Sequence, residues 1–232
     1  MTDLVLVAGA WLGSWAWDDV VPELRAAGHG VHPVTLAGLA ERRGEPVGQQ
    51  THVQDIVDVV ERGDLRDVVV VGHSYSGIPV GQAAERIGER LRRVVFVDAN
   101  VPTDGKSFAS GWAGPAEFAA AIAANGGFWA PLTAADFVDQ GLTDEQIARI
   151  VGGSTPHPGA SLTEPAVLAR SMGELPAMYI KCLLDGDEPR AEVAELLATS
   201  ERWRRVDLDT GHWPMFSQPR ELAGLLLDAA AA

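Results

Sequence analysis

The stretch DVVVVGHSYSG, which runs from Asp67 to Gly77, determines how the rest of the sequence is interpreted. Its four consecutive valines predict a strand that is buried on both faces of a sheet. The run ends at Gly72, and the residues from Ser76 onward predict a helix. A serine at a sharp turn between a strand and a helix is the arrangement of a nucleophile elbow. The stretch therefore predicts Ser74 as a nucleophile, with a purely structural turn as the alternative.

Strand and helix patterns alternate along the chain on both sides of this stretch. Apolar residues at helical spacing predict helices, for example at residues 18–27 and 51–62, and short apolar runs predict strands. These further strands are expected at residues 4–8, 31–36, 93–97, 177–184 and 203–208. Such alternation is typical of the α/β class, with a doubly wound, mostly parallel sheet of about six strands and helices on both faces.

The region from about residue 99 to residue 175 interrupts this alternation. Glycine, proline and alanine become more frequent there, and short helical patterns such as the one around Phe118 and Ile122 replace strands. The region follows a strand end, and ligands bind at that edge of open α/β sheets. We therefore expect a helical cap over the site, inserted into one domain that spans residues 1–232.

Composition excludes several classes of protein and of partner. The single cysteine, Cys182, excludes an internal disulfide framework and a cysteine-based metal cluster, and its apolar neighbours predict a core thiol. The net charge of −14 argues against nucleic acids and anionic membranes as partners. No apolar run reaches the roughly 18 residues of a membrane span, and no signal peptide is recognised at the N-terminus. A cytoplasmic location is therefore expected.

A serine nucleophile needs a base, and six histidines compete for that role. His212 is favoured because it follows the last predicted strand, on a loop at the expected active edge. His73 adjoins the serine and is expected to support the site. The others are expected to be solvated, to cap helices or to lie in the cap: His29, His32, His52 and His157.

The base needs a carboxylate to orient it, and the expected order along the chain is serine, acid, histidine. Asp185 fits this order, because it lies between Ser74 and His212 at the end of a predicted strand. Three other carboxylates remain as alternatives: Asp98 at the preceding strand end, Asp187 in the same loop, and Asp209 close to the histidine.

Backbone N–H groups must stabilise the oxyanion that forms when the serine attacks. One donor is expected at Tyr75, directly after the nucleophile, and the other in the loop after the first strand. Ala10 is the first choice in that loop and Trp11 the second. This loop lacks the G-x-G-x-x-G pattern of a dinucleotide site, so that interpretation is set aside.

Aromatic residues are expected to line an apolar substrate pocket near these groups. They flank the proposed oxyanion loop and base or lie in the cap: Trp11, Trp112, Phe128, Trp129 and Trp213. The alternative is that the cap aromatics only pack the cap onto the core, because aromatic residues dominate both pockets and cores.

The motifs VAGA at residues 7–10, GSWAW at 13–17, GHSY at 72–75, DGDEP at 185–189 and Gly-His at 211–212 resemble those of the α/β-hydrolase superfamily. They are most similar to its small-esterase branch, which includes plant methyl esterases, hydroxynitrile lyases and related bacterial esterases. The resemblance implies a triad of Ser74, Asp185 and His212, oxyanion donors at Ala10 and Tyr75, and neither a cofactor nor a metal. It leaves the oligomeric state open, with a homodimer as one option.

Two departures from this branch are visible. Ala8 stands where the branch has the histidine of a His-Gly pair, and we expect this change to affect substrate choice. Ser76 replaces the second glycine of the Gly-x-Ser-x-Gly elbow, and Gly77 follows it. Because serine is small, we expect the elbow to tolerate it.

The motifs together predict a serine hydrolase that cleaves a carboxylic ester of a small apolar molecule through an acyl-enzyme. Methyl esters, other small esters and lactones are all compatible. A non-hydrolytic enzyme with the same triad and a ligand-binding member with vestigial hydrolysis are the alternatives. Hydroxynitrile lyases of the branch have a lysine after the histidine and a threonine in the oxyanion loop, whereas this sequence has Trp213 and Gly9.

Overall fold

Strand β3 (Val68–His73) lies in the interior of a six-stranded sheet, and all its residues are buried. The computed structural model describes residues 1–44, 47–112 and 114–231. Neighbouring strands pair in the order β2-β1-β3-β4-β7-β8, and every pairing is parallel. The other five strands are β1 (Asp3–Val7), β2 (Gly30–Val34), β4 (Leu91–Val97), β7 (Ala177–Cys182) and β8 (Trp203–Leu208). The predicted fold class is confirmed.

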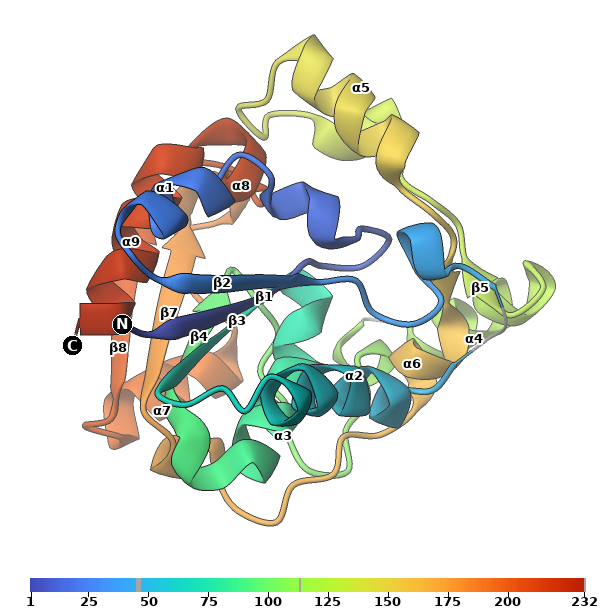
Figure 1. Ribbon diagram of the computed structural model, residues 1–232. Coiled ribbons are helices and arrows are strands. Elements are labelled where there is room, and N and C mark those ends of the chain that lie inside the picture. Colours follow the sequence, from blue (N-terminus) through green and yellow to red (C-terminus); the bar gives the residue numbers. More distant parts are fainter. Residues whose placement is uncertain (45–46, 113, 232) are drawn as a thin grey trace.

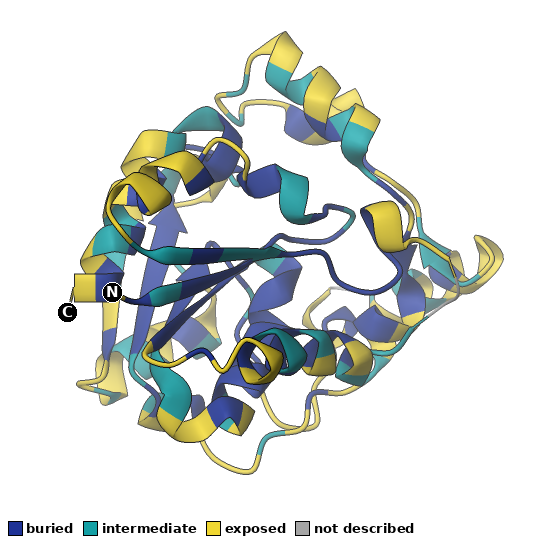
Figure 2. Ribbon diagram, viewed as in Figure 1, coloured by how far each residue is buried: buried dark blue, intermediate teal, exposed yellow. Residues whose placement is uncertain are grey.

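The valine run explains why helices cover both faces of the sheet. Val68 and Val70 pack into one apolar core, whereas Val69 and Val71 pack into a second core on the opposite face. Helices α2, α3 and α7 cover the first face, and α1 and α9 cover the second, as Figure 1 shows. Their bounds are Gln49–Arg62, Gly77–Ile87, Ala191–Thr199, Val21–Ala26 and Pro219–Ala231. Figure 2 shows the buried sheet between helices whose outer sides are exposed.

A segment between β4 and β7, residues 98–176, carries helices and one small sheet, and we call it the inserted segment. Its helices are α4 (Pro115–Ala124), α5 (Asp144–Gly153) and α6 (Gly159–Thr163). Strands β5 (Phe128–Trp129) and β6 (His157–Pro158) pair in antiparallel fashion. In Figure 1 these elements lie at the end of the domain opposite the two termini. Helix α8 (Pro214–Ser217) follows β8 in the main domain.

Two local expectations differ from the structure. His52 is fully buried rather than solvated, because its Nε2–H donates to the Ala37 carbonyl and its Nδ1 lies 2.9 Å from the Tyr75 hydroxyl. The strand predicted at residues 177–184 ends at Cys182, because Leu183–Asp185 form a 3₁₀ turn. Cys182 is buried, as predicted.

The turn after β3 has the tight geometry of a nucleophile elbow. Ser74 has a φ of +54°, a conformation that residues other than glycine rarely adopt. Ser76 fits because its buried hydroxyl lies 2.8 Å from each of two carbonyl oxygens, those of Val7 and His73. The close backbone approach falls instead on Gly77, where a Cβ would lie 2.2 Å from the Asn100 carbonyl oxygen.

Within the described ranges, no helix is long and apolar enough to cross a membrane.

The close approach at Gly77 predicts a stability difference between two glycine substitutions. Gly77→Ala should lower the free energy of unfolding by about 1–3 kcal/mol, because the new methyl group meets rigid backbone. Gly224→Ala, on the exposed face of α9 with open space around it, should raise it by about 0.5–1 kcal/mol. Urea unfolding of both variants measures the two changes, and equal effects would contradict the packing argument.

Candidate active site

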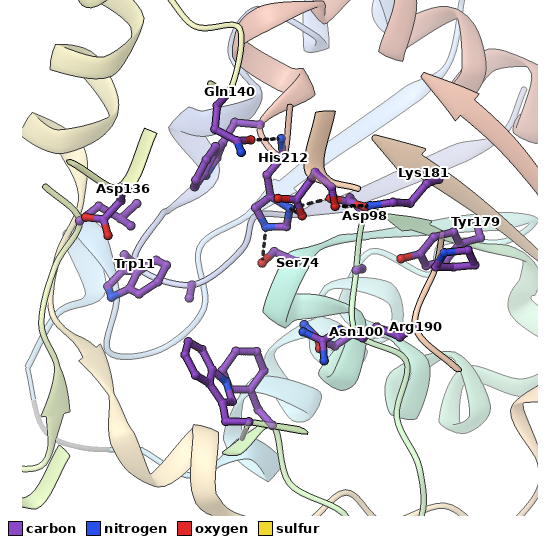
Figure 3. A pocket seen from close by; sticks show the side chains of 18 of the residues that line it. Trp11, Ser74, Asp98, Asn100, Asp136, Gln140, Tyr179, Lys181, Arg190 and His212 are labelled. Carbon is purple, nitrogen blue, oxygen red and sulfur yellow. Dashed lines mark hydrogen bonds and ion pairs between the residues drawn. The ribbon is translucent and has the colours of Figure 1, made fainter. Parts of the chain in front are cut away.

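The parallel register brings the ends of neighbouring strands to one edge of the sheet. His73, the last residue of β3, pairs with Val97, the last residue of β4. The next residues are Ser74 and Asp98, so their side chains emerge side by side. The loop after β8 brings His212 to the same edge, and Figure 3 shows the three side chains around one cavity.

Ser74 and His212 are in direct contact. The Ser74 Oγ lies 2.9 Å from the His212 Nε2, and Ser74 is partly exposed to the cavity. A hydroxyl hydrogen-bonded to an imidazole can lose its proton to that ring as it attacks an electrophile. The pair therefore has the geometry of a nucleophile and its base.

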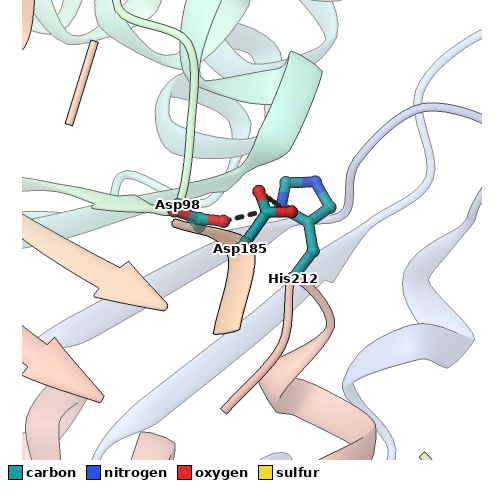
Figure 4. Close-up of side chains that lie close together, drawn as sticks. All are labelled: Asp98, Asp185 and His212. Carbon is teal, nitrogen blue, oxygen red and sulfur yellow. Dashed lines mark hydrogen bonds and ion pairs between the residues drawn. The ribbon is translucent and has the colours of Figure 1, made fainter. Parts of the chain in front are cut away.

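Two carboxylates lie beside the other ring nitrogen of His212, as Figure 4 shows. The Nδ1 is 2.7 Å from the Asp98 Oδ2 and 3.4 Å from the Asp185 Oδ2. Only 3% of the Asp98 side chain is exposed, compared with 42% for Asp185. The sequence favoured Asp185 and left Asp98 as an alternative. The structure brings both together and gives Asp98 the shorter, buried hydrogen bond, whereas Asp187 and Asp209 lie outside the cavity lining.

A buried lysine holds the first of these carboxylates. The Lys181 Nζ is 2.6 Å from the Asp98 Oδ1 and 3.1 Å from the Asp185 carbonyl oxygen. A buried charge needs a partner, and here the two opposite charges compensate each other. Sequence reasoning missed Lys181, although a charged residue in the middle of an apolar, fully buried strand was a visible signal.

The backbone of His212 is also held on both sides. Its N–H donates to the Gln140 Oε1 at 2.6 Å, and its carbonyl oxygen accepts from the His73 Nε2–H at 2.7 Å. His73 therefore supports the base. Gln140 comes from the inserted segment, and no motif around it in the sequence indicated a contact with His212.

The charges of the site shift the pKa values of its groups. Burial disfavours the imidazolium of His212, but the carboxylates of Asp185 and Asp98 outweigh burial and raise the pKa of His212 to about 9. Partial burial opposes ionisation of Asp185, but the His212 ring outweighs it and lowers the pKa of Asp185 to about 2. Burial, together with the nearby His212, lowers the pKa of His73 to about 3. His73 is therefore neutral and donates from Nε2.

The backbone groups expected to form an oxyanion hole lie beside the serine. A Cβ on Gly9 would lie 2.9 Å from the Ser74 Cβ, so the loop after β1 packs directly against the elbow. Among the described residues, neither the Ala10 N–H nor the Tyr75 N–H has a hydrogen-bond acceptor. The Trp11 N–H donates to the His157 Nδ1 at 3.2 Å. Ala10 and Tyr75 therefore keep free donors, whereas Trp11 does not.

The cavity has a volume of about 530 Å³, and four of the five predicted aromatic residues line it: Trp11, Trp112, Trp129 and Trp213. Phe128 does not line it, which corrects the prediction. Its neighbour Trp129 faces the cavity, and successive side chains of a strand point to opposite sides. Phe108 also lines the cavity, and so do the polar side chains of Asn100 and Arg190 (Figure 3).

The spacing of three side chains would also allow them to bind a cation. One ligand atom from each of Asp98, Asp185 and His212 lies within 4.8 Å of the other two. The Lys181 ammonium already neutralises Asp98 at 2.6 Å and would repel a second cation. The group therefore fits a hydrogen-bonded triad better than a metal site.

The opposite pKa shifts predict separate titrations of the histidines. His212 should gain its proton at about pH 9, whereas His52 and His73, with pKa values lowered to about 4 and about 3 by burial, should stay neutral at pH 5.5. The raised pKa of His212 stabilises the folded protein fully below pH 6.5, and this contribution is lost as the pH rises through about 9. Imidazole ¹⁵N chemical shifts followed from pH 5 to pH 10 measure the titration of His212 and show whether His52 and His73 stay neutral, with Asp98→Asn as the variant in which the His212 pKa should fall. A His212 ring that is already neutral at pH 7 would contradict this charge balance.

Known proteins match this chain over nearly its whole length. A model of the alpha/beta hydrolase family matches residues 4–225. A carbendazim hydrolyzing esterase of Nocardioides sp. (strain SG-4G) is 32% identical over 239 residues, which cover 96% of this chain and 97% of that protein. Methylesterase 3 of Arabidopsis thaliana is 25% identical over 260 residues, which cover 98% of this chain and 95% of that protein.

A solved structure has the same fold. It is an extracellular alpha/beta-hydrolase from a Paenibacillus species, with a TM-score of 0.86, 24% identity and 99% coverage of both chains. The resemblance inferred from the motifs is thereby confirmed. With a family match over most of its length and a relative of 32% identity, the chain belongs to the alpha/beta hydrolase family.

Proposed function

We propose that this protein is a serine esterase that cleaves a small carboxylic ester through an acyl-enzyme. The observation that carries the proposal is the contact of 2.9 Å between the Ser74 Oγ and the His212 Nε2, with a carboxylate on the opposite ring nitrogen. Relatives named as esterases support the same reaction class.

In the acylation step, Ser74 attacks the ester carbonyl carbon while His212, in its neutral form, accepts the hydroxyl proton at Nε2; the raised pKa of about 9 means that this form becomes more populated as the pH rises toward 9. The carbonyl oxygen becomes an oxyanion, which the N–H groups of Ala10 and Tyr75 stabilise. The carbon–oxygen bond to the alcohol then breaks, and His212 returns its proton to the departing alkoxide. In the second step, a water that His212 deprotonates attacks the acyl carbon, the bond from that carbon to the Ser74 Oγ breaks, His212 returns the proton to Oγ, and the acid is released.

We propose Asp98, rather than Asp185, as the carboxylate that orients the base. Its hydrogen bond to His212 is 2.7 Å long, and its position is fixed from behind by Lys181. Asp185 lies 3.4 Å from the same nitrogen and is half exposed. In this assignment Asp185 adds negative charge near the imidazolium but does not fix the ring.

The cavity supports a flat or aromatic substrate. Trp11 and Trp129 pack with their ring centroids 4.0 Å apart, and Phe108 lies against Trp129. Aromatic walls bind flat apolar groups through area and ring geometry. Aryl acetates, methyl esters of aromatic acids, lactones and carbendazim, which the first relative is named for, form the panel that tests this substrate class.

Replacement of the nucleophile tests the reaction class. Ser74→Ala should lower kcat on p-nitrophenyl acetate by about 10⁴–10⁶-fold and abolish the initial burst, because no acyl-enzyme can form. Ser110→Ala, at an exposed serine of the inserted segment, is the control and should leave both unchanged. A fluorophosphonate probe should label the unsubstituted protein at Ser74. No turnover and no labelling would instead identify a binding protein.

Replacement of each carboxylate tests the assignment of the triad. Asp98→Asn should lower kcat by about 10³–10⁴-fold, because the amide cannot hold the reactive tautomer of His212. Asp185→Asn should cost less than about tenfold, because its half-exposed charge is screened. Asp187→Asn, in the same exposed loop, should have no effect on the steady-state kinetics that measure all three.

Loss of Asp98 also leaves Lys181 buried without a counter-charge, at a cost of about 3–5 kcal/mol. The double variant Asp98→Asn/Lys181→Met removes both charges and should recover the stability but not the activity. A larger loss of kcat in Asp185→Asn than in either Asp98 variant would assign the orienting role to Asp185.

A further inference from the structure

The residue after the proposed oxyanion donor is strained. Trp11 has a φ of +67°, a conformation that residues with a side chain rarely adopt. It persists only where the surroundings hold it. The Ala10 N–H belongs to the Gly9–Ala10 peptide, and the Ala10–Trp11 peptide is the next one along the chain. The contacts that hold Trp11 therefore restrict the Ala10 backbone angles, which relate the two peptides and so help to orient the donor.

The inserted segment holds both backbone groups of Trp11. The Thr155 N–H donates to the Trp11 carbonyl oxygen at 3.0 Å. The Trp11 N–H donates to the Nδ1 of His157, a fully buried residue of β6, at 3.2 Å. The two contacts come from residues two positions apart and clamp Trp11 from one side.

The hydrogen bonds of His157 fix its tautomer. Since Nδ1 accepts from Trp11, the proton lies on Nε2, which donates to the Ser161 Oγ at 2.9 Å. The Ser161 hydroxyl in turn donates to the Pro158 carbonyl oxygen at 2.7 Å. Burial lowers the pKa of His157 well below its usual value, so the ring stays neutral. The neutral ring leaves Nδ1 available as the acceptor for Trp11.

The same segment also touches the second donor. The Tyr75 hydroxyl lies 2.9 Å from the His52 Nδ1 and 3.3 Å from the Ser161 carbonyl oxygen. Because the His52 Nε2–H donates to Ala37, its Nδ1 accepts from Tyr75. The rings of Tyr75 and His157 pack edge to face with centroids 4.7 Å apart. One buried network thus reaches Tyr75, the second proposed donor, and Trp11, the residue after the first.

We propose that His157 is a positioning residue for ester hydrolysis, because it accepts the Trp11 N–H and thereby aims the Ala10 N–H at the oxyanion. The proposal rests on the proposed function, since it concerns the same site. His157 is fully buried and is not among the described residues that line the cavity. It acts on the transition state through the geometry of the loop after β1.

This role predicts a loss in kcat with little change in KM. The full negative charge on the substrate oxygen exists only in the transition state, so a misaimed donor weakens transition-state binding more than substrate binding. Removal of one oxyanion donor costs about 10²–10³-fold in kcat. Misaiming it should cost less, about 10–100-fold.

Two substitutions at His157 separate positioning from packing. The amide oxygen of His157→Asn falls near the position of Nδ1 and can still accept from Trp11. The longer His157→Gln places its amide near Nε2, so it keeps the Ser161 contact and loses the Trp11 contact. His157→Gln should lower kcat on p-nitrophenyl acetate by about 10–100-fold with KM within about twofold, and His157→Asn should stay within about threefold in kcat.

A transition-state analogue gives a second readout. Phenylboronic acid forms a tetrahedral adduct with a serine nucleophile and places an oxygen in the oxyanion hole. Its affinity should fall in His157→Gln by the same factor as kcat/KM, because both depend on the Ala10 N–H. Equal kcat values in the Asn and Gln variants, or unchanged boronate affinity in His157→Gln, would overturn the proposal.

Melting temperatures show whether the two His157 variants fold, and one NMR measurement tests the proposal without them. If neither variant folds, the unsubstituted protein still tests the contact, since an N–H···N hydrogen bond transmits scalar coupling between the Trp11 amide nitrogen and the His157 Nδ1. Its absence would overturn the proposal. An unsubstituted protein that hydrolyses no ester refutes the proposed function, whereas an active protein with an equally active His157→Gln variant refutes this inference alone.

Discussion

Three parallel strands end at the same edge of the sheet, and the chain must turn sharply after each of them. The turns place three residues with side chains at positive φ, namely Trp11 at +67°, Ser74 at +54° and Asp98 at +43°. Such conformations persist where the surroundings over-determine them. The Asn100 N–H donates to the Ser74 carbonyl oxygen, and the Asp98 N–H donates to that of Ile180. The register thus gathers the proposed oxyanion loop, nucleophile and acid at one edge of the sheet, and neighbouring backbone contacts offset the cost of these conformations.

His212 lies where this edge meets the inserted segment, and each of its polar atoms has a partner. The ring contacts Ser74 and Asp98, and the backbone contacts Gln140 and His73. An imidazole held on both ring nitrogens cannot rotate away between accepting a proton and returning it. Such preorganisation spares the enzyme the cost of ordering the base during the reaction.

The sequence predicted those parts of the site that depend on local pattern. The valine run identified β3, the residues that follow it identified Ser74, and chain order identified His212. Chain order could not show whether Asp98 or Asp185 lies closer to the His212 ring, because that depends on how far the end of each strand lies from the ring. Sheet register decides that distance, together with Lys181 behind Asp98. Helical periodicity likewise placed the helix of His52 correctly but could not show that its ring meets Tyr75, which lies 23 positions further along the chain.

The inserted segment both lines the cavity and holds the backbone of the proposed catalytic groups, and these two roles are coupled. Its aromatic residues, including Trp112 and Trp129, line the cavity and shape what enters. Its polar residues Gln140 and His157 bind the backbone of the base and of the oxyanion loop. β5 and β6 pair directly, with Trp129 opposite His157, so a change that moves the aromatic wall also moves the histidine that holds Trp11. Selection for a new substrate through this segment therefore acts on the rate of the chemical step as well as on binding.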